Sequence, residues 1–326
     1  MSLKQLFARV ALGTLTLVAA VTAQAQAPVF PSKPMRIVVT FTPGGAPDII
    51  ARILAERFAA TWGQSVLVDN KPGSGGNIGA DFVAKATPDG HTLVVGTVGT
   101  HSINGALYSK MPYDMVKDFA PISLVATTPN MLVVHNEVPA RTVQELIALG
   151  RKGEKMTFAS AGSGTSIHVS GELFKSMTGI DMTHIPYKGR AIAIPDLLGA
   201  RVTMMFDNMP SSLPLVREGK LRALAVTSTK RAAAAPDIPT IAESGLPGFE
   251  AVSWFAVFAP AGTPKPVVDK LQAEISRILK TPEVAKKLTD IGLEPVGSTA
   301  DELAAYQKTE IVKWAKVVKD SGARAD

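Results

Sequence analysis

Apolar and polar positions follow one another along this chain in a repeated order of strand, glycine turn and helix. In the first instance, the apolar run Ile37-Val38-Val39 stops at Pro43-Gly44-Gly45. Asp48 then begins a helical pattern over residues 49–58, with apolar side chains on one face. This order exposes backbone N–H groups at the positive end of a helix dipole, which suits a carboxylate or a phosphate. An ordinary turn between a strand and a helix explains one such motif equally well.

Similar turns recur further along the chain, and together they indicate the fold class. Residues 70–77 and 97–101 each follow a short apolar strand pattern, and residues 161–166 follow a third and open a helix. Strands that alternate with helices indicate parallel sheets covered on both faces. The chain has more strand–turn–helix units than a single sheet usually contains, so we predict an α/β protein with two lobes. Each lobe is then a mainly parallel sheet flanked by helices, with a ligand cleft between the lobes.

Two long extended segments, near residues 122–134 and 250–260, are the candidates for crossings between the lobes. Two helical patterns close the chain, and we expect them to return to the first lobe. The predicted division is therefore discontinuous. Lobe 1 comprises residues 28–125 plus 253–326, and lobe 2 comprises residues 126–252.

The N-terminus has the pattern of an export signal. Lys4 and Arg9 precede or border the apolar run 10–20, which is too short to span a bilayer. Small residues follow, and we expect cleavage near Ala25 or Ala27, so that residues before this point are a signal peptide and the mature protein is periplasmic. A membrane anchor is the alternative. The chain has no cysteine, which excludes lipid attachment at the cleavage point and any disulfide framework.

The net charge and its distribution indicate which classes of partner the protein can bind. The chain has 34 Lys and Arg against 28 Asp and Glu, a formal charge of +6. Without Lys4 and Arg9 the balance is 32 against 28, or +4. These charges are dispersed, with no basic run between aromatic residues, so we predict no nucleic-acid binding.

Motifs for catalysis, metals and nucleotides are missing. In residues 73–79 the G-x-G-x-x-G pattern fails because Ile78 stands where glycine is required, and no P-loop follows. H-E-x-x-H, G-x-S-x-G and S-x-x-K do not occur. The five histidines are scattered singly and each is expected to be structural. We therefore predict no catalytic residue, no metal site and no cofactor.

The glycine turns themselves supply the binding chemistry. They follow strands, and ligands bind at the carboxyl ends of strands in open α/β sheets. Carboxylate recognition there needs only convergent N–H groups and hydroxyls. The candidates from the residues alone are Thr42, Gly44 and Gly45 in one lobe, and Ser160, Gly162, Thr165 and Ser166 in the other.

Several segments together resemble a known family. The segments include FTPGGAPD (41–48), ASAGSGTSIHVSGELFK (159–175) and HIPYKG (184–189), together with residues 31–40, 49–52, 68–97, 113–125, 205–228 and 259–264. The chain resembles the periplasmic substrate-binding receptors of tripartite tricarboxylate transporters, also called Bug proteins, over essentially the whole mature sequence.

The resemblance implies a flytrap-like periplasmic binding protein, a monomer that closes over a small organic carboxylate and docks on a two-component membrane permease. It also implies site residues. In the first lobe these are Phe41, Thr42, Pro43, Gly44, Gly45 and Asp48, with Asn77, Thr97 and His101 on neighbouring loops. In the second lobe they are Ala161, Thr165, Ser166 and His168, with Asp207 on a loop that faces the cleft and Trp254 or Phe255 as its wall.

The sequence departs from the family after Tyr-Lys-Gly, where relatives carry a small residue and this chain has Arg190. A surface arginine, or one paired with a nearby acid, is one interpretation. The other is that Arg190 binds a second, distal carboxylate with two parallel hydrogen bonds. An aromatic or aliphatic dicarboxylate would then fit.

Two further functions remain open from the sequence. The same fold could serve a sensor kinase instead of a permease. An exported enzyme acting on carboxylates is the other alternative, against which the missing catalytic motifs count.

Overall fold

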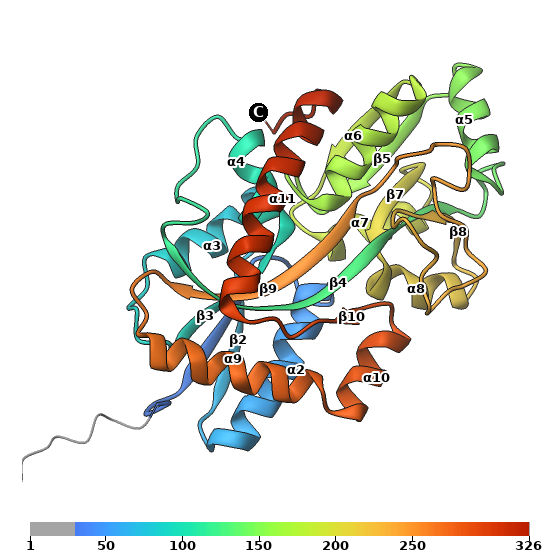
Figure 1. Ribbon diagram of the computed structural model, residues 1–326. Helices are drawn as coiled ribbons and strands as arrows, with labels where there is room; N and C mark the ends of the chain where they lie inside the picture. The colour runs from blue at the N-terminus through green and yellow to red at the C-terminus, as the bar shows by residue number, and fades with distance from the viewer. Residues whose placement is uncertain (1–29, 326) are drawn as a thin grey trace, which may run out of the picture. The chain divides into compact units, whose positions relative to one another are not determined.

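A ten-stranded mixed sheet organises the computed structural model, which describes residues 30–325 (Figure 1). The strand order is β2-β1-β3-β9-β4-β7-β5-β6, while β8 and β10 pair with β4 outside this path. The predicted signal peptide lies outside the described residues. The strands are β1 (Met35–Val39), β2 (Val66–Asn70), β3 (Thr92–Thr97), β4 (Phe119–His135), β5 (Met156–Ser160), β6 (Met182–Pro186), β7 (Met204–Asn208), β8 (Leu221–Val226), β9 (Val252–Pro260) and β10 (Glu294–Pro295).

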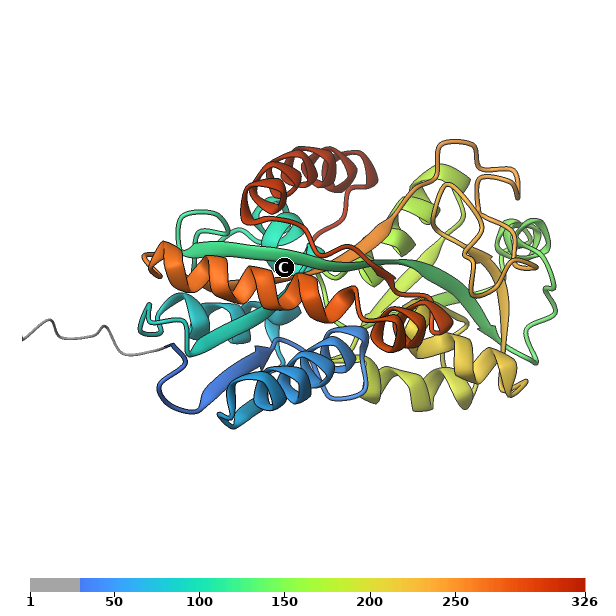
Figure 2. The same ribbon diagram turned by 60° about the horizontal axis from the view of Figure 1, so that its bottom comes forward.

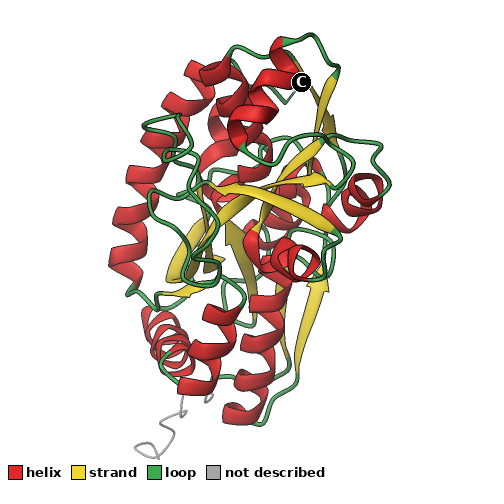
Figure 3. Cartoon of the chain, turned by 90° about the vertical axis from the view of Figure 1, so that its right-hand side faces the viewer, coloured by secondary structure: helices red, strands yellow, loops and turns green. Residues whose placement is uncertain are grey.

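Helices connect and cover the strands (Figure 3). They are α2 (Ala46–Trp62), α3 (Asn77–Ala84), α4 (Asn104–Leu107), α5 (Val143–Arg151), α6 (Ser166–Thr178), α7 (Arg190–Leu198), α8 (Met209–Arg217), α9 (Lys265–Leu279), α10 (Pro282–Asp290) and α11 (Ala300–Ser321). Two short helical turns, η1 (Ser74–Gly76) and η2 (Gly99–Ile103), follow β2 and β3. None of the helices within residues 30–325 is both long and apolar enough to span a bilayer.

The predicted two-lobed α/β fold is confirmed. We call the part built on β1, β2 and β3 the first lobe, and the part built on β5, β6, β7 and β8 the second lobe. Each contains three parallel strands, with β1 between β2 and β3 and β5 between β6 and β7. The long strands β4 and β9 add antiparallel pairs. Strand β9 pairs with β3, and strand β4 pairs with β7, β8 and β9.

Strand β4 joins the two lobes, as its length and apolar sequence predict. Its first part pairs with β9 and its last part pairs with β7 and β8. In Figure 1 the two strands β4 and β9 run side by side through the middle of the molecule. Most side chains of both strands are buried, which fits strands covered on both faces. The predicted lobe boundaries near 125 and 252 fall within β4 and at the start of β9, and they stay a prediction.

The helices pack through the apolar faces that the sequence predicts. In α2 the buried face includes Ile50, Leu54 and Phe58, and the helix ends at Gly63, whose φ of 67° is the left-handed conformation that favours glycine. Helix α9 packs along β4 and against α2 (Figure 2). Helix α11 contacts η2 and α4 of the first lobe and α6 of the second, so it spans both lobes.

Candidate ligand-binding site

A narrow cavity of about 40 Å³ lies between the two lobes, at the carboxyl ends of β1, β3, β5 and β7. This is the edge at which open α/β sheets bind ligands. Nine of the predicted site residues line it: Phe41, Thr42, Gly45, Thr97, Ala161, Thr165, Ser166, Arg190 and Asp207. Seven further residues complete the lining: Pro47, Val98, Ile167, Asn208, Ser211, Ser253 and Phe255.

Four helices begin at this cavity. Gly45 is the N-cap of α2, Thr165 that of α6 and Asn208 that of α8, while Arg190 is the first residue of α7. Helix N-termini carry a partial positive charge, so the four together favour a negative group. Among the lining residues the charged side chains are Arg190 and Asp207, which form an ion pair. The four helix N-termini therefore favour an anion even though the one cationic side chain of the lining is already paired.

Unpaired backbone donors are available at two of these helix starts. Within residues 30–325, the N–H groups of Gly45, Ser166 and Ile167 make no hydrogen bond to protein. The next amide of α6, that of His168, is capped by Thr165 Oγ1 at 3.2 Å. The amides of Gly45, Ser166 and Ile167 remain unpaired, and all three residues line the cavity. A ligand carboxylate in the cavity can accept hydrogen bonds from such amides.

The Pro-Gly-Gly loop is held in place from behind by Asp48. Its Oδ2 accepts from the Gly44 N–H at 3.0 Å and from Arg52 Nε at 2.9 Å, and its Oδ1 accepts from Asn70 Nδ2 at 3.0 Å. Burial alone would raise the pKa of Asp48, but the hydrogen bonds from Arg52, Gly44 and Asn70 lower it below its usual value. Asp48 therefore positions the loop. It lies outside the cavity lining, as do the exposed Pro43 and Gly44.

Asn77 and His101 also lie behind the lining, although the sequence placed them among ligand contacts. Asn77 Oδ1 accepts from Asn104 Nδ2 at 2.6 Å and from Tyr113 OH at 2.9 Å. The His101 ring stacks on Phe258 with centroids 4.0 Å apart, and burial lowers its pKa to about 3. Both side chains make internal contacts near the turn after β3, while His101 Nε2 is buried without a hydrogen bond to the described residues.

The loop after β5 rests on two stacked histidines, His168 and His184, whose ring centroids are 4.1 Å apart. Ser160 Oγ bonds His184 Nε2 at 2.7 Å and accepts from the Gly162 N–H at 3.1 Å. The Gly164 N–H donates to His168 Nδ1 at 3.2 Å. Ser160 and His168, both predicted site residues, thus lie outside the lining and fix the loop that carries Ala161 and Thr165.

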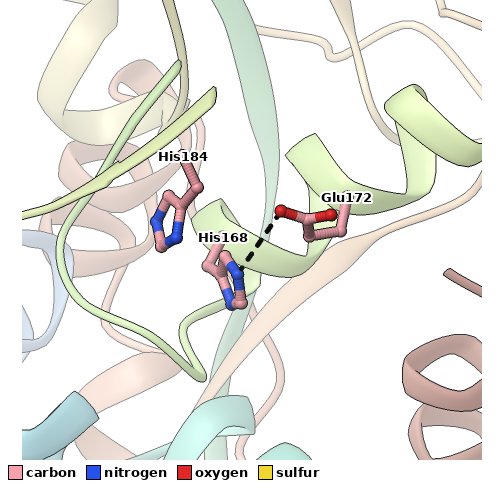
Figure 4. A group of neighbouring side chains, drawn as sticks. All are labelled: His168, Glu172 and His184. Atoms are coloured by element: carbon pink, nitrogen blue, oxygen red, sulfur yellow. Dashed lines mark ion pairs between the residues drawn. The ribbon is translucent and has the colours of Figure 1, made fainter. Parts of the chain in front are cut away.

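His168, His184 and Glu172 form the one group within the described residues whose composition and spacing suit a metal ion (Figure 4). Because His168 Nδ1 accepts a backbone hydrogen bond, the proton of the neutral ring is on Nε2, the atom 3.8 Å from Glu172. A metal-bound nitrogen must be unprotonated. This arrangement therefore suits neutral histidines, and burial lowers the pKa of His168 to about 3 and that of His184 to about 4.

Arg190 lines the cavity and is paired with an acid, which is the first of the two interpretations of the sequence. The second, a contact to a distal ligand carboxylate, stays a prediction. Its Nε donates to Asp207 Oδ2 at 2.6 Å and its Nη2 donates to the Ser211 carbonyl at 2.6 Å. Ser212 Oγ donates to the same Asp207 oxygen. Within residues 30–325, Nη1 of Arg190 makes no hydrogen bond.

Most of the lining residues that sequence reasoning missed stand beside predicted ones along the chain, as Pro47, Val98, Ile167 and Asn208 do. Of the two aromatic candidates for the wall, Phe255 lines the cavity. Trp254 points elsewhere, because its Nε1 donates to Glu310 at 3.1 Å. Ser253 could not be found from local pattern, since its place beside Ser166, with 2.6 Å between the hydroxyl oxygens, depends on the path of β9.

The lobes touch closely beside the cavity. Tyr108 OH, from the first lobe, donates to the Ser163 carbonyl of the second at 2.9 Å. A Cβ added at Gly75 would lie 2.1 Å from that same oxygen, and one at Gly189 would lie 2.5 Å from Thr42 Oγ1. Glycine at position 75 therefore permits a close approach to the backbone of the opposite lobe, and glycine at position 189 leaves room for the Thr42 side chain. The two lobes are in direct contact at both places.

Comparison with known proteins places this chain among solute receptors. A family model described as "Tripartite tricarboxylate transporter family receptor" matches residues 50–323. A Pseudomonas sp. (strain P51) protein from the tcbD-tcbE intergenic region is 42% identical over 89% of this chain and 86% of its own length. The protein BugT of Bordetella pertussis is 37% identical over 96% of this chain and 97% of its own length.

Two solved structures are similar along almost their whole length. Rpa4515 of R. palustris, solved with adipate, has a TM-score of 0.88 and 40% identity, over 90% of this chain and 99% of its own. MatC of Rhodopseudomonas palustris, solved with bound malate, has a TM-score of 0.85 and 36% identity, over 89% of this chain and all of its own.

Proposed function

Because the chain belongs to the receptor family of tripartite tricarboxylate transporters, which includes the Bug proteins, we propose that it captures a small organic carboxylate in the periplasm and delivers it to a two-component membrane permease. The observation that carries this proposal is the interlobe cavity at which four helices begin. The unpaired N–H groups of Gly45, Ser166 and Ile167 are the donors that we assign to the ligand carboxylate. We propose that the protein acts as a monomer.

The ligands of two relatives support this class of ligand. Adipate and malate are both small carboxylates with two acidic groups, and the proteins solved with them are 40% and 36% identical to this chain. Main-chain donors recognise any carboxylate, so the shape and polarity of the cavity select among them.

We infer that the protein binds its ligand without converting it chemically. A general base works best when its pKa is close to the working pH. Burial lowers the pKa of His101 and His168 to about 3, and neither side chain lines the cavity. We therefore infer that the ligand leaves chemically unchanged, and that lobe closure around it is the signal for docking on the permease.

We propose further that the ligand is a dicarboxylate whose distal carboxylate accepts a hydrogen bond from Arg190 Nη1. Replacing Arg190 with alanine should then weaken adipate at least tenfold more than hexanoate, its analogue with one carboxylate, because a hydrogen bond to a charged group contributes about 1.5–3 kcal/mol. Isothermal titration calorimetry of both acids measures the ratio. Arg201→Ala, at an exposed arginine paired with Asp196, is the matched control. Equal losses for both acids would refute the dicarboxylate.

The experiment for the function itself uses the full mature chain freed of ligand by denaturation and refolding. A thermal-shift screen of mono-, di- and tricarboxylates should find acids that raise the melting temperature, since a ligand of the native state stabilises it by mass action. The bound acid should be recovered unchanged, and its uptake into cells that carry the permease should require this protein. An acid that returns chemically altered would contradict the receptor function.

A further inference from the structure

A loop of the second lobe, residues 162–164, contacts the first lobe at the turn that follows β3 and at the end of α4. The Tyr108 hydroxyl, at the C-terminal end of α4, donates to the Ser163 carbonyl at 2.9 Å. An added Cβ at Gly99 would lie 2.7 Å from the Gly164 carbonyl oxygen, which is closer than a methyl group can approach. The backbone of the loop therefore lies directly against the first lobe, and Tyr108 bonds it there.

The polar groups of this loop find partners in both lobes. Within the second lobe, the Gly162 N–H donates to Ser160 Oγ at 3.1 Å, and the Gly162 carbonyl accepts from Thr165 Oγ1 at 2.8 Å. The Ser163 carbonyl accepts from Tyr108 of the first lobe. Separation of the lobes would break the bond to Tyr108 and leave the bonds of Gly162 unchanged. The bond to Tyr108 therefore depends on the arrangement of the two lobes.

The loop is continuous with the ligand cavity, because Ala161 precedes it, Thr165 follows it, and both residues line that cavity. Tyr108 is not part of the lining. It lines a second cavity, of about 270 Å³, together with Gly75 of the first lobe and Ser163 of the second. Any effect of Tyr108 on the ligand must therefore pass through the loop and the contact between the lobes.

We propose that Tyr108 is a positioning residue that slows ligand release by holding the 162–164 loop against the first lobe. Its hydrogen bond stabilises the arrangement in which the lobes touch, and the ligand leaves after this contact is broken. Tyr108 therefore affects the dissociation rate and not the association rate, as most changes at an interface do. Because Tyr108 does not touch the ligand, its effect is equal for every acid bound. This inference rests on the proposed function and adds to it a residue that sets how long the ligand stays bound.

Stopped-flow kinetics with the full mature chain measure both rate constants. Tyr108→Phe should release the ligand about threefold to tenfold faster at an unchanged association rate, because one neutral hydrogen bond is lost. Adipate and malate are the first two probes, and the two acids that most raise the melting temperature replace them if they do not bind. The factor should be the same for both acids. A residue with only a structural role would not change the dissociation rate alone.

Two further variants complete the test. Tyr187→Phe is the matched control, because Tyr187 lines the same second cavity but its hydroxyl donates to Asp196 within the second lobe at 2.6 Å. It should keep the wild-type rates. Gly99→Ala should also speed release, since its added Cβ would push the Gly164 carbonyl away from the first lobe. The φ of Gly99 lies outside the left-handed region, so alanine fits the local backbone there.

The outcomes separate this inference from the proposed function. If none of the screened carboxylates binds the wild type, the proposed function fails. If carboxylates bind but Tyr108→Phe releases them at the wild-type rate, or by factors that differ between the two acids, the receptor stands and the role of Tyr108 is wrong. Equally fast release from Tyr187→Phe would also contradict it. Should Tyr108→Phe fail to fold, the release rate of Gly99→Ala decides, and a wild-type rate there would overturn the inference.

Discussion

Gly75→Ala should lower the affinity for the ligand about tenfold to hundredfold while the protein remains folded. The added Cβ would lie 2.1 Å from the Ser163 carbonyl oxygen, which belongs to the backbone of the opposite lobe. Overpacking of this kind costs about 1–3 kcal/mol, and here the cost falls on the closed arrangement, since separating the lobes relieves it. Calorimetry measures the affinity, and circular dichroism confirms the fold.

Gly63→Ala is the matched control for this prediction. Gly63 has a φ of 67°, close to the 60° of Gly75, but nothing lies within 4 Å of an added Cβ. Both variants therefore carry the cost of about 1–2 kcal/mol for a left-handed alanine, and Gly75→Ala alone meets the other lobe. Wild-type affinity in Gly75→Ala would show that binding does not require this closed contact.

The free energy of unfolding should fall by about 4 kcal/mol between pH 7 and pH 5 through His101 and His168 alone. Burial lowers the pKa of each to about 3, whereas an unfolded histidine has a pKa near 6.5. Between these values the unfolded state binds more protons, so stability is lost as the pH falls through 6.5, at up to about 1.4 kcal/mol per pH unit for each histidine. His184, whose pKa is lowered to about 4, acts in the same direction.

Denaturant unfolding at the two pH values measures this loss, and the choice of pH 5 keeps most carboxylates ionised in both states. Glu172, whose pKa is raised by burial, opposes part of the effect. His101→Phe, which keeps a ring against Phe258, should reduce the pH dependence by about 2 kcal/mol. Equal stability of the wild type at pH 7 and pH 5 would show that these histidines are not buried as neutral groups.

The sequence predicts residues of the cavity lining where their position depends on the local chain. A strand, a glycine turn and a helix start adjoin one another in the sequence, so Gly45, Thr165 and Ser166 could be placed at the cavity before any tertiary structure was known. The crossing strand β4 was also predictable, because its 17 residues form a long extended apolar segment.

Contacts that depend on the tertiary fold could not be predicted from the sequence. Asp48 follows the Pro-Gly-Gly loop in the sequence, yet its carboxylate turns back to Gly44 and also accepts from Asn70, which only the fold brings near. His168 and His184 looked isolated but stack on each other because α6 and β6 adjoin. The partner of Arg190 could not be chosen from the sequence either, since Asp207 lies near the end of β7 while Arg190 begins α7.

The most direct test is a crystal structure of the mature protein with a carboxylate that raises its melting temperature. We predict that the carboxylate lies between the lobes, with its oxygens within hydrogen-bond distance of the N–H groups of Gly45, Ser166 or Ile167. A ligand bound outside the interlobe cavity, or bound inside it without any contact to these amides, would contradict the account.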